Sequence, residues 1–169
     1  MAAEFKNPVT QKLVDFIRQI GIEVVHTAIG CPTFLPGILV ENGRILVDES
    51  KLTYPGDLLH EAGHLAVAPG DLRGTLSGEV ALPGVSMAPV EVHAIAWSYA
   101  AIVHLGLDPM IVFHSGGYGL GSERLLSNYN LGVYIGANGL EDAGLTVLPA
   151  GAKERGVAPY PHMLKWLRD

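Results

Sequence analysis

The alternation of apolar and polar positions predicts a mainly helical chain. In the first predicted helix, apolar residues recur at helical spacing, Pro8 suits the first turn, and Gly21 follows the last periodic position. Pro69 stands just past the end of a second apolar run. A third run is apolar on nearly every face, so we expect it at the centre of the molecule. The predicted helices span residues 8–20, 57–68 and 89–106, with shorter helical runs at 110–114, 124–129 and 160–169.

Two stretches near the N-terminus have the character of β-strands. Residues 22–29 are rich in β-branched side chains, and residues 37–48 hold two apolar runs around Asn42-Gly43, the strongest short hairpin signal. Residues 69–89 are rich in Gly and Pro, which favours a long loop that we expect to act as a lid. No element is assigned over 133–160. The pattern predicts an α+β fold, one mainly helical domain over residues 1–169, with a small antiparallel sheet beside the second helix.

Composition and charge narrow the functional classes. The chain has 169 residues, 49% of them apolar, and a net charge of −6. Its eleven Lys and Arg residues are scattered singly, so no basic stripe is available to bind a phosphate backbone, and nucleic acid is not an expected partner. With Cys31 as the only cysteine and no secretory pattern at the N-terminus, we expect a cytoplasmic protein.

The longest apolar segment, 88–107, approaches the length of a membrane span. It carries Glu91, His93 and His104, each of which is costly in lipid. We therefore expect a buried helix there and no membrane span.

The second predicted helix carries the candidate chemistry. His60 and His64 are four residues apart, so on a helix their rings lie on one face and can reach one point. Glu61 follows the first histidine, where its carboxylate can reach a water on a metal ion held by the two rings. This His-Glu-x-x-His pattern is the zincin signature. Gly63 lies inside the same helix, where it is explained best by another segment packing very close.

A catalytic zinc takes three protein ligands, so the pattern requires one more. Glu91 opens the most apolar helix, where an unpaired carboxylate is prohibitive, whereas Glu79 lies in the Gly-rich loop and can be solvated. We favour Glu91 as the third ligand, with Glu79 as the alternative.

A family resemblance enters at this point. The stretch His60-Glu61-Ala62-Gly63-His64, preceded by a helix and a hairpin, resembles the short gluzincin-type metallopeptidases, and most closely the ImmA/IrrE family. Glu91-Val92-His93-Ala94-Ile95-Ala96-Trp97 is similar to that family's ligand-bearing helix. The resemblance covers residues 8–105, and the loop at 69–89 and the tail after 106 have no counterpart in it. It implies zinc on His60, His64 and Glu91, with Glu61 as the base.

Four other residues are candidates for stabilising the oxyanion of such a reaction. His114, Tyr118, Tyr99 and His93 are chemically able to donate a hydrogen bond to an oxyanion, and we favour His114 or Tyr118, next to Gly116-Gly117. The glycines of 116–122 match neither phosphate-binding fingerprint, which argues against a nucleotide site. Cys31 is expected to be an ordinary small side chain.

Three hypotheses follow for the function. The first is a small zinc-dependent peptidase that acts on a peptide or protein substrate, with Glu61 activating a zinc-bound water. The second is a zinc-binding regulatory or interaction domain without turnover, and the third a metal-free helical domain in which the motif is coincidental. The sequence does not predict cleavage preference or oligomeric state.

Overall fold

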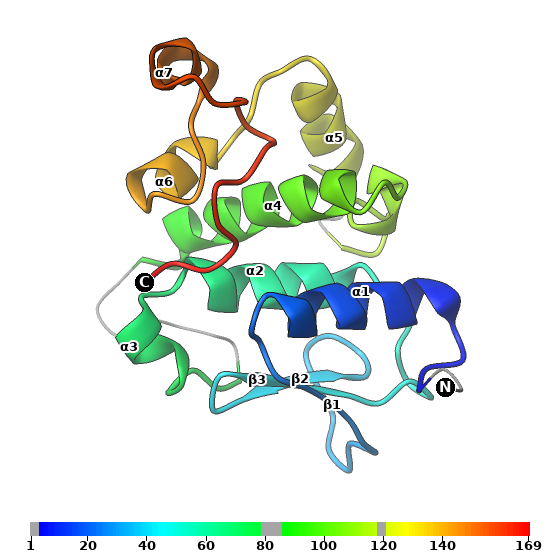
Figure 1. Ribbon diagram of the computed structural model, residues 1–169. Helices are drawn as coiled ribbons and strands as arrows, with labels where there is room; N and C mark the ends of the chain where they lie inside the picture. Colours follow the sequence, from blue (N-terminus) through cyan, green and yellow to red (C-terminus); the bar gives the residue numbers. More distant parts are fainter. Residues whose placement is uncertain (1–3, 79–85, 118–120) are drawn as a thin grey trace.

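The computed structural model describes residues 4–78, 86–117 and 121–169 (Figure 1). The sheet lies on one side of helices α1 (Pro8–Gln19) and α2 (Asp57–Val67), and α4 (Met87–His104) lies on the other side with the C-terminal helices beyond it. Residues 79–85 lie outside the described residues, and so does Tyr118. The undescribed stretch includes Glu79 and seven of the 21 residues of the predicted lid. The elements are α1 (Pro8–Gln19), β1 (Val24–His26), β2 (Ile38–Glu41), β3 (Arg44–Val47), α2 (Asp57–Val67), α3 (Gly70–Arg73), α4 (Met87–His104), the 3-10 helix η1 (Pro109–Ile111), α5 (Ser122–Asn130), α6 (Ala137–Asp142) and α7 (Pro149–Arg155).

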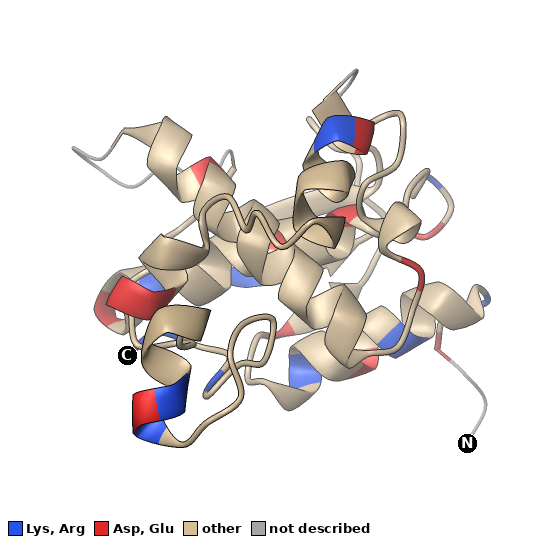
Figure 2. Cartoon of the chain, turned by 90° about the horizontal axis from the view of Figure 1, so that it is seen from above, with Lys and Arg blue, Asp and Glu red and all other residues tan. Residues whose placement is uncertain are grey.

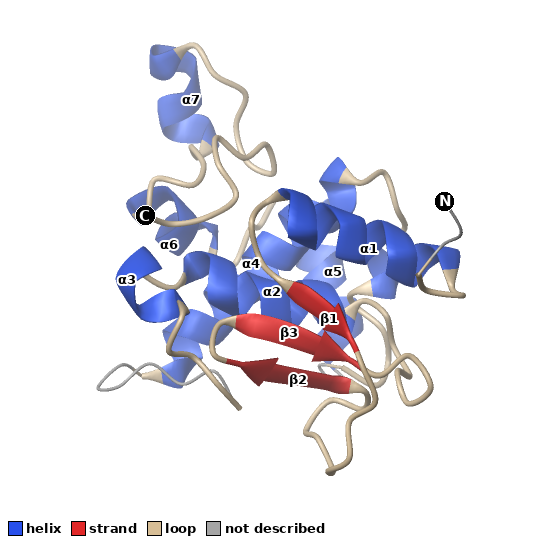
Figure 3. Ribbon diagram, turned by 60° about the horizontal axis from the view of Figure 1, so that its bottom comes forward, coloured by secondary structure: helices blue, strands red, loops and turns tan. Residues whose placement is uncertain are grey.

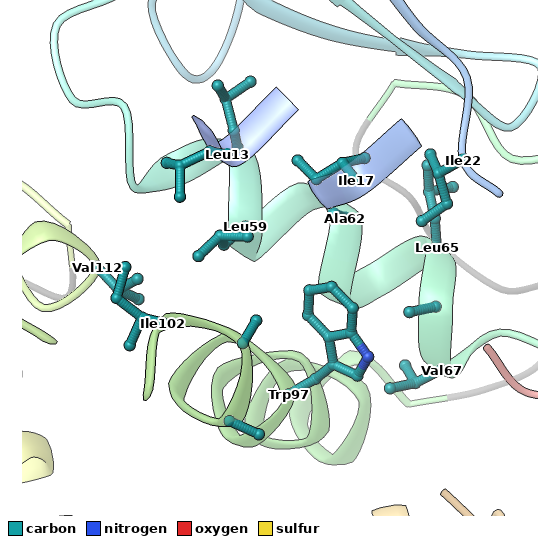
Figure 4. Packing of buried hydrophobic residues seen from close by; sticks show 14 of the residues in the cluster. Leu13, Ile17, Ile22, Leu59, Ala62, Leu65, Val67, Trp97, Ile102 and Val112 are labelled. Carbon is teal, nitrogen blue, oxygen red and sulfur yellow. The ribbon is translucent and has the colours of Figure 1, made fainter. Parts of the chain in front are cut away.

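Helix α1 forms where the apolar spacing predicted it. The Asn7 side chain caps its first turn by accepting hydrogen bonds from the backbone N–H groups of Val9, at 2.9 Å, and Thr10. Leu13 and Ile17 are fully buried, and Figure 4 shows them above α2. The helix therefore contributes one apolar face to the core, as its amphipathic pattern indicates.

The sheet has the strand order β1-β3-β2 (Figure 3). Strands β2 and β3 form the predicted hairpin, with Asn42 at φ 51° and Gly43 at φ 74°, the two positive values that a tight hairpin turn requires. The prediction of an antiparallel sheet was wrong for β1, which pairs with β3 in parallel from Val24↔Ile45 onward, so the sheet is mixed. Apolar periodicity specifies which face of a strand is buried but not which neighbour it pairs with, and here the chain crosses from β1 to β2 before returning through β3.

Helices α2 and α4 form the centre of the molecule. Figure 4 shows Trp97 and Ile102 of α4 facing α2 from the side opposite α1. The buried apolar residues of these helices, α1 and the sheet belong to one continuous core. This confirms the prediction that the helix expected over 89–106, which corresponds to α4, lies at the centre of the molecule. In the described parts of the chain, α4 and the other helices fall short of the length and apolar character needed to cross a membrane.

The C-terminal third departs most from the sequence pattern. Helices α6 and α7 lie in the segment to which no element was assigned, and α3 lies within the predicted loop. The predicted closing helix over 160–169 was wrong, because backbone donors there bond to other elements instead of to the preceding turn. Leu164 N–H donates to Leu145 O at 2.8 Å, and Arg168 N–H donates to Ala66 O at 2.9 Å. This segment is therefore an irregular strap across the core helices.

The charged residues are spread over separate elements (Figure 2). Arg18 pairs with Glu4 at 2.6 Å, and Arg44 pairs with Glu41 at 2.5 Å across the hairpin turn. Such exposed pairs contribute little to stability. Arg18 and Arg44 are thus each paired with a neighbouring acidic side chain.

Candidate metal centre

Helix α2 directs both histidines of the motif to one point. The His64 side chain is 5% exposed and that of His60 is 13% exposed, so both rings are largely withdrawn from water. The ring planes are nearly perpendicular, at 88°, and the two Nε2 atoms are 3.1 Å apart. The i, i+4 spacing that suggested a shared partner therefore produces converging nitrogens.

Helix α4 brings Glu91 to the same point. Its Oε1 lies 3.1 Å from His60 Nε2, and its Oε2 lies 3.2 Å from His64 Nε2. Ligands of a tetrahedral zinc, at bond lengths of about 2.0 to 2.1 Å, stand roughly 3.3 Å from one another. The three residues form a group with the spacing and chemistry of a metal site, and two imidazoles with one carboxylate are a known catalytic zinc set.

The electrostatics of this group favour a bound cation. The rings of His60 and then His64 hold the pKa of Glu91 well below its usual range, so this carboxylate is ionised. If both Nε2 atoms donated to Glu91, their hydrogens would crowd each other at a separation of 3.1 Å. A metal ion removes this conflict because it takes the place of both hydrogens.

Close packing of α2 on α4 sets the position of Glu91. A Cβ atom added to Gly63 would lie 2.8 Å from Ala94 O, so only glycine permits this separation between the helices. Ser98 Oγ lies 2.7 Å from Ala94 O and 3.1 Å from Leu59 O, linking α4 to the residue that precedes His60. The close approach expected at Gly63 is confirmed. Ala94 stands three residues after Glu91, so this contact also fixes the distance from Glu91 to the histidines.

No family model, curated protein or solved structure matches this chain. The resemblance to gluzincins and to the ImmA/IrrE family therefore stays a prediction. The case for the site accordingly rests on the contacts among these side chains.

Glu61 lies beside the three candidate ligands without being one of them. It is half-buried, and this burial raises the pKa of its carboxyl group to about 7. The neighbouring His64 acts in the opposite direction, while Glu91 and Asp57 raise the pKa further. A carboxyl group with such a pKa can both accept and release a proton near neutral pH.

His114, proposed as an oxyanion donor, is buried next to α2. Its Nε2 lies 2.8 Å from Asp57 Oδ1, and its ring stacks on Tyr54 with centroids 3.8 Å apart. Asp57 stands one helical turn before Glu61 and lines the same cleft, whereas His114 is not among the described lining residues. Its role as an oxyanion donor stays a prediction, and in this conformation its Nε2 is engaged by Asp57.

The other two candidates lie at other places on α4. Tyr99 belongs to an aromatic cluster, with its ring centroid 4.5 Å from that of Tyr129. His93 packs against α6, where a Cβ on Gly139 would meet its Nε2 at 2.0 Å. Neither is among the described residues that line the cleft. His93 therefore packs between α4 and α6.

The candidate ligands open into a cleft of about 590 Å³. One wall is the edge strand β2 with the preceding loop, and the opposite side comes from α2 and the start of α4. Periodicity did not predict this wall, because the loop before β2 has no regular pattern, but the apolar Phe34 between Pro32 and Pro36 was a signal in the sequence. The described lining residues are Pro32, Thr33, Phe34, Leu35, Ile38, Leu39, Val40, Asp57, His60, Glu61, His64, Gly78, Met87, Glu91 and Gly117.

Proposed function

We propose that this protein is a zinc-dependent hydrolase that cleaves peptide bonds. One observation carries the proposal: the two Nε2 atoms and the Glu91 carboxylate converge within 3.2 Å of each other, next to a separate carboxylate on Glu61. His60, His64 and Glu91 would hold the metal. A set of three protein ligands leaves a coordination position for water, as in catalytic zinc sites.

Zinc, when bound, supplies a Lewis acid that lowers the pKa of its water to about 7 and polarises the substrate carbonyl. Glu61 accepts the proton as the water oxygen attacks the carbonyl carbon. Glu61 then delivers that proton to the amide nitrogen and the C–N bond breaks. The products are an amine and a carboxylic acid, which loses its remaining proton to solvent. Its half-buried position favours this role, because burial brings the pKa of the carboxyl group close to neutral.

The wall of the cleft supports a peptide as the substrate. Strand β2 is at the edge of the sheet, with β3 as its only neighbour in the described sheet, and three of its residues line the cleft. An edge strand offers backbone donors and acceptors to an extended chain. On β2, Ile38 N–H already donates to Leu35 O at 3.1 Å and Val40 O accepts from Gly78 N–H at 2.9 Å, so a peptide would use the remaining outward groups. An extended peptide along β2 would pass beside His60 and Glu61.

A zinc-binding domain without turnover is the second candidate. The three candidate ligands join α2 to α4, the two central helices, so a bound metal would also stabilise the fold. In this alternative, zinc removal lowers the free energy of unfolding while no peptide is hydrolysed.

The change Glu61→Gln separates these two functions. The amide cannot accept the proton, so we expect hydrolysis of a peptide library to fall roughly 10²- to 10⁴-fold while one zinc per chain is retained. Glu154→Gln, at an exposed position of α7, is the matched control and should leave the rate unchanged. Hydrolysis by the Glu61 variant at the original rate would disprove the mechanism, and zinc binding without cleavage of any peptide would favour the second candidate.

A further inference from the structure

Phe34 is the most exposed of the large apolar side chains in the described parts of the chain, at 86%. It projects from the loop that joins β1 to β2, and it lines the cleft that holds the candidate metal ligands. A single exposed apolar side chain on a surface needs no explanation. An exposed aromatic ring at the wall of a cleft that holds candidate metal ligands can instead pack against a bound substrate.

The loop that carries Phe34 is held at both ends. At one end, Ile29 N–H donates to Asp48 Oδ2 at 3.0 Å, and at the other end Asp48 N–H donates to Gly37 O at 2.8 Å. Gly37 has φ +79°, and a Cβ there would lie 2.5 Å from Leu52 N, so the chain must turn tightly at this point. The base of the loop is therefore fixed against the sheet.

Hydrogen bonds inside the loop fix the residues next to Phe34. Leu35 O accepts from Ile38 N–H at 3.1 Å and from Thr33 Oγ1 at 2.7 Å. These bonds constrain the backbone on both sides of Phe34. Its ring is thus presented by an ordered backbone, which lowers the entropy cost of using it in binding.

The cleft combines apolar walls with negative charge. Apolar side chains line it from the loop, β2 and α4, while the charged groups on the described lining are the carboxylates of Asp57, Glu61 and Glu91. Lys and Arg are missing from that described lining. An acidic substrate side chain beside the apolar walls would therefore lose its water without gaining a Lys or Arg partner among these residues.

We propose that Phe34 determines substrate specificity by packing against a bulky apolar side chain close to the scissile bond of an extended peptide. This inference rests on the proposed function. The cleft selects apolar segments over acidic ones. Apolar walls without a Lys or Arg partner supply the discrimination against acidic side chains, and Phe34 supplies the attraction for apolar ones.

The test compares Phe34→Ala with Leu131→Ala, whose wild-type side chain is 79% exposed and is not among the described cleft-lining residues. The zinc-loaded full chain is assayed with end-blocked decapeptides that differ only in carrying Phe-Leu, Ala-Ala or Glu-Glu at the centre. We expect the Phe-Leu peptide to be the best substrate and the Glu-Glu peptide the poorest. Phe34→Ala should lower kcat/KM for the Phe-Leu peptide about tenfold and reduce its advantage over Ala-Ala, whereas Leu131→Ala should preserve that advantage.

A binding measurement keeps this test independent of turnover. The zinc-loaded Glu61→Gln chain, alone and combined with Phe34→Ala or with Leu131→Ala, is titrated with the Phe-Leu and Glu-Glu peptides. Preferential binding of the Phe-Leu peptide that Phe34→Ala weakens supports the specificity role, even if the wild-type chain hydrolyses nothing and the proposed function fails. Equal affinity for both peptides, binding of neither, or the same loss in both alanine variants would overturn it.

Discussion

Two polar side chains buried in and next to α2, Asp57 and His114, are paired with each other. The Asp57 carboxylate meets His114 Nε2 at 2.8 Å, and both side chains are about nine-tenths buried. Removal of either partner would leave the other polar group buried alone, which is costly. These residues therefore have an evident structural role beside the candidate metal centre, in addition to any role in chemistry.

Asp48 is a second buried carboxylate with a structural role, and its pKa leads to a pH prediction. Hydrogen bonds from Ser50, then from the backbone of Ile29, and the nearby Lys51 lower its pKa to about 2. A carboxylate whose pKa is lower in the folded state stabilises the fold above its unfolded pKa of about 3.9. That contribution is lost as the pH falls from about 4 toward 2.

We therefore expect Asp48→Asn to lower the free energy of unfolding at pH 6, and this deficit to shrink as the pH is reduced through that range. Denaturant unfolding of both proteins across pH 2–6 measures the difference. Asp15→Asn, at an exposed position of α1, controls for loss of a surface carboxylate. A deficit that stays constant or grows toward pH 2 would contradict the assignment.

At the scale of elements, the crossing of α2 and α4 determines whether the candidate ligands meet. We expect Gly63→Ala to weaken zinc binding, since the new Cβ would lie 2.8 Å from Ala94 O and push α4 away from the histidines. Overpacking of this kind costs about 1 to 3 kcal/mol, partly offset by about 1 kcal/mol of helix propensity gained over glycine.

Gly151→Ala in α7 is the matched control, because a Cβ there meets only ordinary contacts, the nearest at 3.4 Å to Val147. It should leave zinc affinity unchanged and the stability unchanged or slightly increased. Titration with zinc and denaturant unfolding give both readouts. An unchanged zinc affinity in Gly63→Ala would show that the helix spacing does not control the site.

Periodicity correctly predicted the elements whose structure is determined by signals within their own sequence. Helix α1 has a capping residue and a single apolar face, and the hairpin has Asn42-Gly43 at its turn. The parallel pairing of β1 and the irregular segment at 160–169 depend on partners far away in sequence. Leu164 N–H, for example, bonds to Leu145 O. Local pattern carries no information about such contacts.

At the scale of the whole molecule, the candidate site also combines features that local spacing predicts with features that depend on distant contacts. Helical spacing predicted that His60 and His64 share a face, and the cost of burying a carboxylate singled out Glu91, which the structure brings to both rings. The loop wall with Phe34, and the pairing of Asp57 with His114, depend on tertiary contacts that no spacing rule contains. One fold thus joins residues from α2, α4 and the β1–β2 loop around one cleft.

Metal content is the most direct test of the central claim. Mass spectrometry of the purified chain, of Glu91→Ala and of the control Glu154→Ala would count the metal ions bound to each chain. We predict one zinc per chain in the unaltered protein and in the control, and a weakened or lost zinc in Glu91→Ala. An unaltered protein that holds no metal after incubation with zinc would contradict the account.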